Sequence, residues 1–273
     1  MRLLQGSGRL FATAMVVVAL IVAAPAAAVI GGTSDTANTY ANVGVLQLKV
    51  GSDWFDFCSG TLVRPNVVLT AAHCTDFLVD VGPDGFGPAD LRISLDPAGN
   101  APYYLVDHIV VNPLWFTAGP CFANSKQACL SPPHEDISLV FLKTSVAGVT
   151  PAPIAGADYL DQLNLKSETF TVVGYGTDDF VTGSAASPKA VTIFDGIRSY
   201  RDVSAIPAQD AFPDRFLKIT QGVCFGDSGG ALFHGRTIVA VNTWTFSYRC
   251  DGPNLEYRVD SAPAQAFLAA NLT

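Results

Sequence analysis

The stretch Gly226-Asp227-Ser228-Gly229-Gly230 carries the most information about the fold and chemistry of this 273-residue chain. Glycines on both sides of a serine let the backbone and a substrate approach its hydroxyl closely, and they can place two amide N–H groups beside it. A serine hydroxyl is a weak nucleophile, so this stretch needs a general base. The candidates for that base are His73, His108, His134 and His234.

Two other segments hold the remaining groups for such chemistry. His73 lies in Thr70-Ala71-Ala72-His73-Cys74, at the end of an apolar run where a cysteine bridge could fix its ring. Asp136 opens Asp136-Ile137-Ser138-Leu139-Val140, where a strand would leave the carboxylate partly buried and oriented. We expect His108 and His234 to be ordinary strand residues and His134 to be a loop residue.

These three segments, in this order and preceded by Val29-Ile30-Gly31-Gly32, resemble the chymotrypsin family of serine proteases. The resemblance spans nearly the whole mature chain. It implies an all-β fold of two six-stranded antiparallel β-barrels with the active site in the cleft between them. Ser228 would be the nucleophile, His73 the general base and then acid, and Asp136 the group that holds the imidazole tautomer. The amides of Gly226 and Ser228 would form the oxyanion hole, and no cofactor or metal is expected.

The apolar pattern also indicates an all-β chain with a helix at its end. From residue 43 to residue 259, short runs of Val, Ile, Leu, Phe and Thr are broken by Gly, Pro, Asn or Asp, which is typical of strands. Asp260 and Ser261 can cap a terminal helix that continues to Leu272. The predicted strands are residues 43–50, 67–70, 91–95, 104–111, 137–142, 169–173, 231–234 and 238–244.

Two features predict the domain organisation: an N-terminal signal-peptide pattern and a linker rich in proline and glycine. Arg2 and Arg9 precede the apolar residues 10–24 and an Ala26-Ala27-Ala28 end, the pattern of a signal peptide over residues 1–28. An uncleaved anchor is the alternative, but the apolar run is short of the about 20 residues that a membrane span needs. Residues 145–157 resist regular structure. We therefore expect an N-terminal barrel over residues 29–145 and a C-terminal barrel with the helix over residues 146–273.

Charge and cysteine content restrict the partners. Asp and Glu outnumber Lys and Arg by 24 to 16, so nothing favours binding to nucleic acid or to an anionic membrane. The expected protein is a secreted monomer whose partners are a peptide or protein substrate and a protein inhibitor. Six cysteines in a secreted chain predict disulfides and not metal ligands. The resemblance pairs Cys58 with Cys74 and Cys224 with Cys250. Cys121 and Cys129 then pair by elimination, in a loop over residues 118–133 that looks like an insertion.

The resemblance also places the primary specificity pocket. Gly222 falls at its base, where trypsin-like members carry an aspartate, so a basic side chain would find no counter-charge there. Thr245 falls on one wall, where a β-branched side chain narrows the slot. Asn254 falls on the other wall, although Glu256 departs from the usual aromatic residue nearby. Trp244 belongs to the segment that pairs with substrate, which puts Thr243 behind the triad carboxylate. Cleavage after small or medium apolar residues such as Ala, Val or Leu is therefore predicted.

A route to activation follows from the same family pattern. In the family, the mature amino terminus folds inward and its ammonium pairs with the aspartate before the nucleophile. The corresponding pair here is Val29 and Asp227. Val29 follows Ala28 directly, so one cut by signal peptidase would both release and activate the enzyme. The competing interpretation puts that cut near Ala24, with later trimming of a few alanines.

Three alternatives remain open. A Gly-x-Ser-x-Gly stretch also occurs in α/β-hydrolases, but there the acid and the histidine follow the serine, and only His234 follows here. The scaffold could also serve as a secreted binding protein without catalysis, although all three triad members are present. Asp80, Asp84 and Asp90 could bind calcium, but their spacing fits no defined calcium motif, so a solvated loop is favoured.

Overall fold

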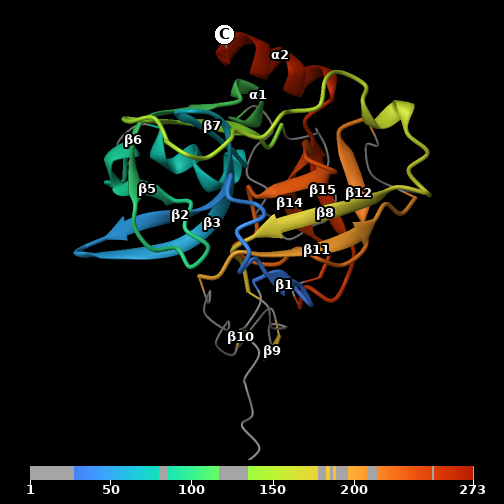
Figure 1. The fold of residues 1–273 in the computed structure, drawn as a ribbon, viewed down its shortest axis with the longest axis horizontal. Helices are drawn as coiled ribbons and strands as arrows, with labels where there is room; N and C mark the ends of the chain where they lie inside the picture. Colours follow the sequence, from blue (N-terminus) through green and yellow to red (C-terminus); the bar gives the residue numbers. More distant parts are fainter. Residues whose placement is uncertain are drawn as a thin grey trace, which may run out of the picture.

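A computed structural model describes residues 28–79, 85–116, 135–177, 183–184, 187–188, 196–207, 214–247 and 249–272 of the chain. Within these ranges the chain forms two bodies of β-structure that lie side by side (Figure 1). The C-terminal helix lies at one end of the molecule. The predicted all-β fold with a short terminal helix is confirmed.

The first body is a closed barrel of six antiparallel strands in the order β2-β3-β4-β7-β6-β5. Gly51, at φ +65°, makes the tight turn between the first two of them. Their apolar side chains, such as Leu46, Leu62 and Ile93, fill the barrel and are fully buried. The strands are β2 (Val43–Val50), β3 (Asp53–Arg64), β4 (Val67–Thr70), β5 (Leu91–Ser94), β6 (Tyr103–Val111) and β7 (Ser138–Leu142).

The second body is a seven-stranded sheet in the order β1-β11-β8-β13-β14-β15-β12. A bridge between Ala205 and Ile219 joins β11 to β12, so six of the strands curl into a second barrel. The seventh, β1 (Thr33–Ser34), pairs with β11 and comes from the segment expected in the first barrel. The others are β8 (Thr169–Gly174), β11 (Ser199–Ser204), β12 (Phe216–Ile219), β13 (Ala231–His234), β14 (Thr237–Thr245) and β15 (Asn254–Arg258).

The remaining elements are short. The helix α2 (Ala262–Asn271) begins after Ser261 as predicted and buries Ala264, Phe267 and Leu268. The Ser261 hydroxyl donates to the Arg258 carbonyl and does not cap the helix. The others are α1 (Pro113–Phe116), a separate pair β9 (Gly183–Ser184) and β10 (Ser187–Pro188), and four 3₁₀ turns at Ala72–Cys74, Asp76–Leu78, Pro88–Asp90 and Leu160–Gln162. None of the helices in the described ranges has the length and apolar character needed to cross a membrane.

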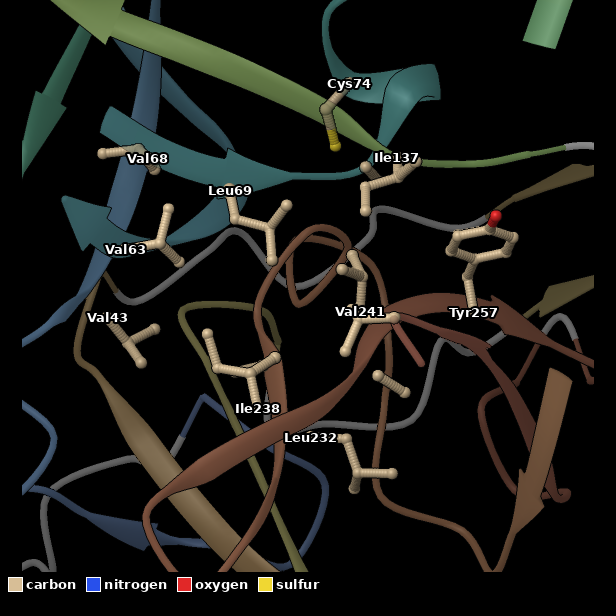
Figure 2. Packing of buried hydrophobic residues seen from close by; sticks show 14 of the residues in the cluster. Val43, Val63, Val68, Leu69, Cys74, Ile137, Leu232, Ile238, Val241 and Tyr257 are labelled. Atoms are coloured by element: carbon tan, nitrogen blue, oxygen red, sulfur yellow. The ribbon is translucent and has the colours of Figure 1, made fainter. Parts of the chain in front are cut away.

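One hydrophobic core runs through both bodies. Leu69 and Ile137 of the first barrel and Val241 of the second sheet belong to the same buried cluster (Figure 2). Burying such side chains stabilises the fold by about 1.5–3 kcal/mol each. Because the shared core spans the junction, the two bodies are held in one relative orientation, and groups at the junction are positioned by both.

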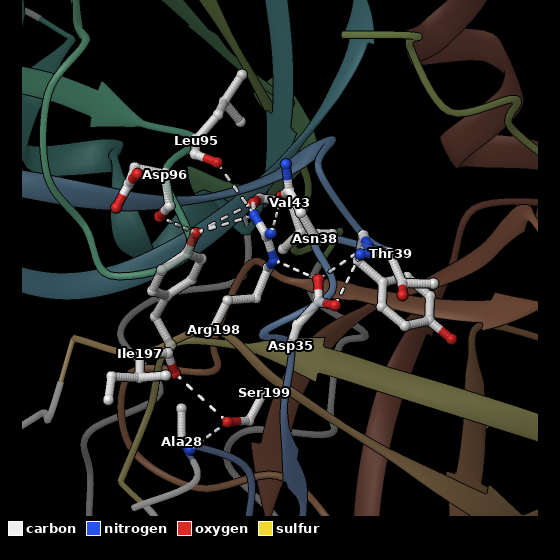
Figure 3. A network of polar contacts seen from close by, with 12 residues as sticks. Ala28, Asp35, Asn38, Thr39, Val43, Leu95, Asp96, Ile197, Arg198 and Ser199 are labelled. Atoms are coloured by element: carbon white, nitrogen blue, oxygen red, sulfur yellow. Dashed lines mark hydrogen bonds and ion pairs between the residues drawn. The ribbon is translucent and has the colours of Figure 1, made fainter. Parts of the chain in front are cut away.

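A buried guanidinium adds a polar link across the same junction (Figure 3). Arg198 is fully buried and its Nε donates to Asp35 Oδ2 at 2.9 Å. Its Nη1 donates to the carbonyls of Val43 and Leu95 at 2.9 and 3.1 Å, and its Nη2 donates to Asn38 Oδ1. A buried charge is tolerated only when it is paired and hydrogen-bonded, and here all three guanidinium nitrogens have acceptors.

Candidate active site

The serine stretch forms a loop that enters β13 and presses against the first barrel. Gly226 and Gly229 have φ of +95° and +82°. A Cβ on Gly229 would lie 2.0 Å from Thr70 Oγ1 and 2.3 Å from the Ser59 carbonyl, so only glycine permits this approach. Ser228 stays partly exposed between these glycines. The predicted nucleophile therefore lies at the junction of the two bodies.

His73 and Asp136 meet because their strands are neighbours. Thr70 at the end of β4 pairs with Ser138 at the start of β7. His73 Nδ1 lies 2.8 Å from Asp136 Oδ2, and the His73 backbone N–H donates to Asp136 Oδ1 at 2.9 Å. The Asp136 side chain is 3% exposed and that of His73 is 26% exposed. With both carboxylate oxygens engaged, the ring is oriented with Nδ1 as donor and Nε2 as the acceptor for a proton.

The environment makes this imidazole more basic. Burial lowers the pKa of His73, but the charge of Asp136 and its hydrogen bond, with a smaller contribution from Asp76, more than offset that effect. The net result is a pKa above the ordinary value of 6.5. A more basic imidazole is a better acceptor for the proton of a hydroxyl.

The Cys58–Cys74 disulfide joins β3, which contacts the serine loop, to the histidine segment. The Ser59 backbone N–H donates to the Ser228 carbonyl at 2.7 Å, and the sulfur of Cys74 lies 3.7 Å from the same oxygen. This sulfur carries no proton, so the second approach is a contact only. Since Cys74 directly follows His73, the disulfide holds the Ser228 backbone beside the His73 segment.

The peptide groups that carry the Gly226 and Ser228 amides are held by hydrogen bonds to their carbonyl oxygens. The Phe225 carbonyl accepts from the Thr177 N–H at 3.0 Å, and the Asp227 carbonyl accepts from the Gly230 N–H at 2.9 Å. In a trans peptide the N–H points opposite to the C=O, so these bonds turn the amides of Gly226 and Ser228 the other way. Neither amide donates to another residue of the described chain. The predicted oxyanion hole would need both of these amides as donors.

A serine hydroxyl from the first barrel also holds this loop. Ser59 Oγ donates to the Gly226 carbonyl at 2.8 Å and accepts from the Tyr175 N–H at 2.9 Å. It therefore links the loop to the end of β8. Ser59 was not expected in the site, because nothing in its local pattern separates it from other strand serines.

Asp227 points into the second sheet. Its Oδ1 accepts from the Gly176 N–H and its Oδ2 from the Cys224 N–H, both at 2.9 Å. A Cβ on Gly174 would lie 2.2 Å from Oδ1, so a glycine there makes room for the carboxylate.

The segment that contains Val29 lies on the same body. Val29 is fully buried, and the Ile30 N–H donates to the Gly222 carbonyl at 3.2 Å. Arg201 Nη1 donates to the Ile30 carbonyl at 2.6 Å, and the Ala28 N–H donates to Ser199 Oγ at 2.7 Å. In the unprocessed chain the nitrogen of Val29 is a peptide amide. An ion pair with Asp227 would need the cut that frees it.

The predicted pocket residues have different roles in the structure. Asn254 is predicted to lie on a pocket wall, and in the structure its Oδ1 accepts from the amides of Gly222 and Val223 at 3.0 and 3.1 Å, so it holds the Gly222 segment in place. The Thr243 hydroxyl, expected behind Asp136, donates to the Val241 carbonyl at 3.0 Å. The Thr245 hydroxyl donates to the Ser247 carbonyl at 3.1 Å, and Trp244 is partly buried beside it.

Two disulfides are present among the described residues, Cys58–Cys74 and Cys224–Cys250, which are the pairs that the resemblance implied. The third predicted pair, Cys121 and Cys129, lies outside the described residues, as do His134, Asp80 and Asp84. Within the described part of the chain, the one group with metal-ligand geometry is Cys58, His73 and Cys74. Its two sulfurs are bonded to each other, so no thiolate is available to a cation.

A polar cluster around Glu135, next to Asp136, was also not predicted. Glu135, which precedes Asp136 and is 1% exposed, accepts from the Tyr257 hydroxyl and pairs with Arg215. Tyr257 and Arg215 both belong to the second body. The cluster therefore ties the Asp136 segment to the other barrel, over a sequence distance that no local pattern reveals.

The fold has two β-barrels, with a histidine–aspartate pair and a serine between glycines at their junction. This combination of fold and residues is typical of a known protein family. A model of the family described as "Trypsin" matches residues 29–267. The chain belongs to this family.

Curated relatives from this family align with different shares of the chain. "Chymotrypsin-like elastase family member 1" of Bos taurus is 38% identical over 93 residues, which are 33% of this chain and 32% of that protein. The chain thus spans about a third of the length of the first relatives it matches. "Trypsin, alkaline C" of Manduca sexta is 25% identical over 240 residues, which are 79% of this chain and 80% of that protein.

Solved structures show the same fold. The structure of "Human heparin binding protein" has a TM-score of 0.62 at 17% identity and covers 89% of this chain and 96% of its own. The "Vibrio cholerae VesB protease" structure has a TM-score of 0.59 at 18% identity and covers 89% and 68%. At these identities the likeness establishes the fold alone.

Proposed function

We propose that this protein is a secreted serine endopeptidase that uses Ser228, His73 and Asp136. The observation that carries this proposal is the double contact of Asp136 with His73, at 2.8 Å to the ring and 2.9 Å to the backbone, beside a serine framed by glycines. A buried carboxylate that fixes one tautomer of a partly exposed imidazole is the arrangement that general-base activation of a hydroxyl requires.

The proposed reaction proceeds through an acyl-enzyme. Ser228 Oγ attacks the carbonyl carbon of the substrate while its proton passes to His73 Nε2, and Asp136 stabilises the imidazolium. The amides of Gly226 and Ser228 bind the oxyanion. His73 then protonates the leaving amine, and water repeats the sequence on the ester to release the acid. Every proton moves between Ser228, His73, water and substrate, so no cofactor is needed.

Covalent labelling tests the proposal. A fluorophosphonate or sulfonyl fluoride reacts far faster with an activated serine than with other side chains, so we expect rapid labelling of one equivalent on Ser228 and none at this position in the matched Ser228→Ala variant. Failure to label folded, processed wild-type protein would favour the second candidate, a binding protein on the same scaffold.

One solved neighbour is named as a heparin-binding protein, and that name is the observation that favours this second candidate. The net charge of -8 argues against a sulfated glycan as the ligand of the present chain. A noncatalytic form of this chain would therefore need a partner of different chemistry.

The base of the candidate pocket supports cleavage after Ala, Val or Leu. Gly222 carries no side chain, and the amides of Gly222 and Val223 are bonded to the uncharged Asn254. A basic substrate side chain would find no counter-charge there and would lose its hydration. A cleavage profile on a mixed peptide library measures the preference. Efficient cleavage after Arg or Lys would contradict it.

The pH dependence follows from the raised pKa of His73. Only neutral His73 accepts the proton of Ser228, so kcat/KM should fall as the pH drops through the raised pKa, at a higher pH than the 6.5 of an ordinary imidazole. Replacing Asp136 with Asn removes the charge that raises this pKa, so the acid limb should move to lower pH as the rate falls. A wild-type rate that is undiminished at pH 4 would exclude His73 as the base.

A further inference from the structure

Two buried side chains on neighbouring strands each have an oxygen without a hydrogen-bond partner among the described residues. Asn242 on β14 and Glu256 on β15 are directly paired across the sheet, and both are 0% exposed. Asn242 Oδ1 and Glu256 Oε1 have no hydrogen-bond partner among the described residues. Directly paired residues on neighbouring antiparallel strands place their side chains on the same face, about 5 Å apart at Cβ.

The orientation of the Asn242 amide is fixed by its other contacts. Its Nδ2 donates to the carbonyls of Val173 and Asp227 at 3.2 and 3.3 Å. The reversed amide would set Oδ1 against two carbonyl oxygens, so Oδ1 must lie on the opposite side, where it needs a donor. The Asn242 backbone also exchanges hydrogen bonds with Gly229 and Gly230, both at 2.8 Å. Asn242 therefore contacts the loop that carries Ser228 through both its backbone and its side chain.

The Glu256 carboxyl also has one oxygen without a hydrogen-bond partner among the described residues. Its Oε2 accepts from the Thr243 N–H at 2.8 Å, which leaves Oε1 as the unpaired atom among the described residues. An ionised carboxylate has only acceptors, so it cannot satisfy the Asn242 oxygen, and its charge would be buried without a cation. A protonated carboxyl has one O–H, and that single donor would satisfy both orphaned oxygens.

We propose that Glu256 is a neutral carboxylic acid in the folded protein and that its Oε1–H donates to Asn242 Oδ1. The bond locks the Asn242 amide with Nδ2 on the Asp227 carbonyl, and that carbonyl turns the Ser228 N–H toward the oxyanion position. Glu256 is therefore a positioning residue for one oxyanion donor, and this catalytic part of the inference rests on the proposed function.

The surroundings of Glu256 agree with this assignment. Burial raises the pKa of Glu256 well above its usual value, the nearby charge of Asp227 raises it further, and the Thr243 amide lowers it. Its paired neighbours, Asn242 on β14 and Leu217 on β12, do not titrate. An ammonium at Val29 would weaken the effect of Asp227, so the experiments use processed protein.

Infrared spectroscopy tests the protonation state without reference to activity. The wild type at neutral pH should show the carbonyl stretch of a buried carboxylic acid, and Glu256→Gln should lack it. Glu168→Gln, at a partly exposed glutamate that pairs with His234, is the matched control and should keep the band. A wild-type spectrum without a protonated carboxyl that depends on Glu256 would overturn the proposal, whether or not the protein is a protease.

Unfolding equilibria give a second measurement. A carboxyl that stays protonated in the folded protein but ionises in the unfolded chain favours unfolding as the pH rises above about 4.5. In a Ser228→Ala background, the unfolding constant of the protein with Glu256 should therefore rise about tenfold per pH unit relative to its Glu256→Gln counterpart. If the unfolding constants of the two proteins depended on pH in the same way, Glu256 would not retain its proton in the folded state.

Kinetics test the positioning role. Gln at position 256 can accept from Thr243 and donate to Asn242, so Glu256→Gln should keep kcat within about threefold. Glu256→Leu removes both bonds and should lower kcat by about tenfold or more with little change in KM, the signature of a weakened oxyanion donor. Equal kcat values for folded Leu and Gln variants would overturn this role. If wild-type Ser228 resists labelling, the proposed function fails, and the spectroscopic result still decides the state of Glu256.

Discussion

Ser228→Ala should lower the rate of peptide hydrolysis by on the order of 10⁴-fold or more while the protein stays folded. The variant keeps the backbone amides at positions 226 and 228, so a residual rate above that of water should remain. His73→Ala should cause a loss of similar size, because the hydroxyl then has no base. The double variant should be little worse than either single one, since the two groups act as a unit. Active-site titration and initial rates on one peptide substrate measure all three.

Circular dichroism and the count of free thiols are the controls for these variants. Both should match the wild type, because the Cys58–Cys74 and Cys224–Cys250 disulfides do not involve the altered side chains. A folded Ser228→Ala protein that keeps more than about a tenth of the activity would show that the hydrolysis comes from another group or a contaminant.

A form with one extra residue before Val29 should lose activity by about a hundredfold or more. The proposed ion pair requires an ammonium at Val29, and Asp227 is fully buried. Leaving one partner of a buried pair without the other costs about 3–5 kcal/mol, which the loop can avoid by giving up the active arrangement. The loss should appear in the fraction of protein titrated by an active-site reagent, with both disulfides retained.

Val29→Ile in correctly processed protein is the matched control, because it keeps the ammonium and the apolar character of the segment. It should retain most of the activity. Amino-terminal sequencing of secreted material should find Val29 first. Full activity from the extended form, or an inactive secreted form that begins upstream of Val29, would refute activation by a single cut.

Local patterns predicted most of the strands. The runs at residues 43–50, 67–70 and 231–234 match β2, β4 and β13 to the residue, and the other five predicted strands differ by at most about one residue at an end. These strands are short, mostly buried and bounded by turn residues, so the signal is contained within each segment. The meeting of His73 with Asp136 was expected from the resemblance to the chymotrypsin family and not from the strand pattern.

Long-range contacts could not be predicted in the same way. Glu256 and Asn242 are ordinary polar residues until the pairing of β14 with β15 places their unpaired oxygens together. The hydrogen bond from the Gly222 amide to Asn254 depends on where the assembled fold places the start of β15. Periodicity within a segment carries no information about which distant segment it will contact, so such roles emerge only from the assembled fold.

The position of β1 determines when this protein can finish folding. The strand lies at Thr33–Ser34, yet its pairing partner β11 begins at Ser199, so β1 can pair only after more than half of the polypeptide has been made. Arg198 closes the same long loop onto Asp35. Such non-local contacts form late because a long stretch of chain must be ordered first. A chain that ends before Arg198 lacks the partners of β1 and Asp35, so we expect the N-terminal half expressed alone to be less stable than the whole chain.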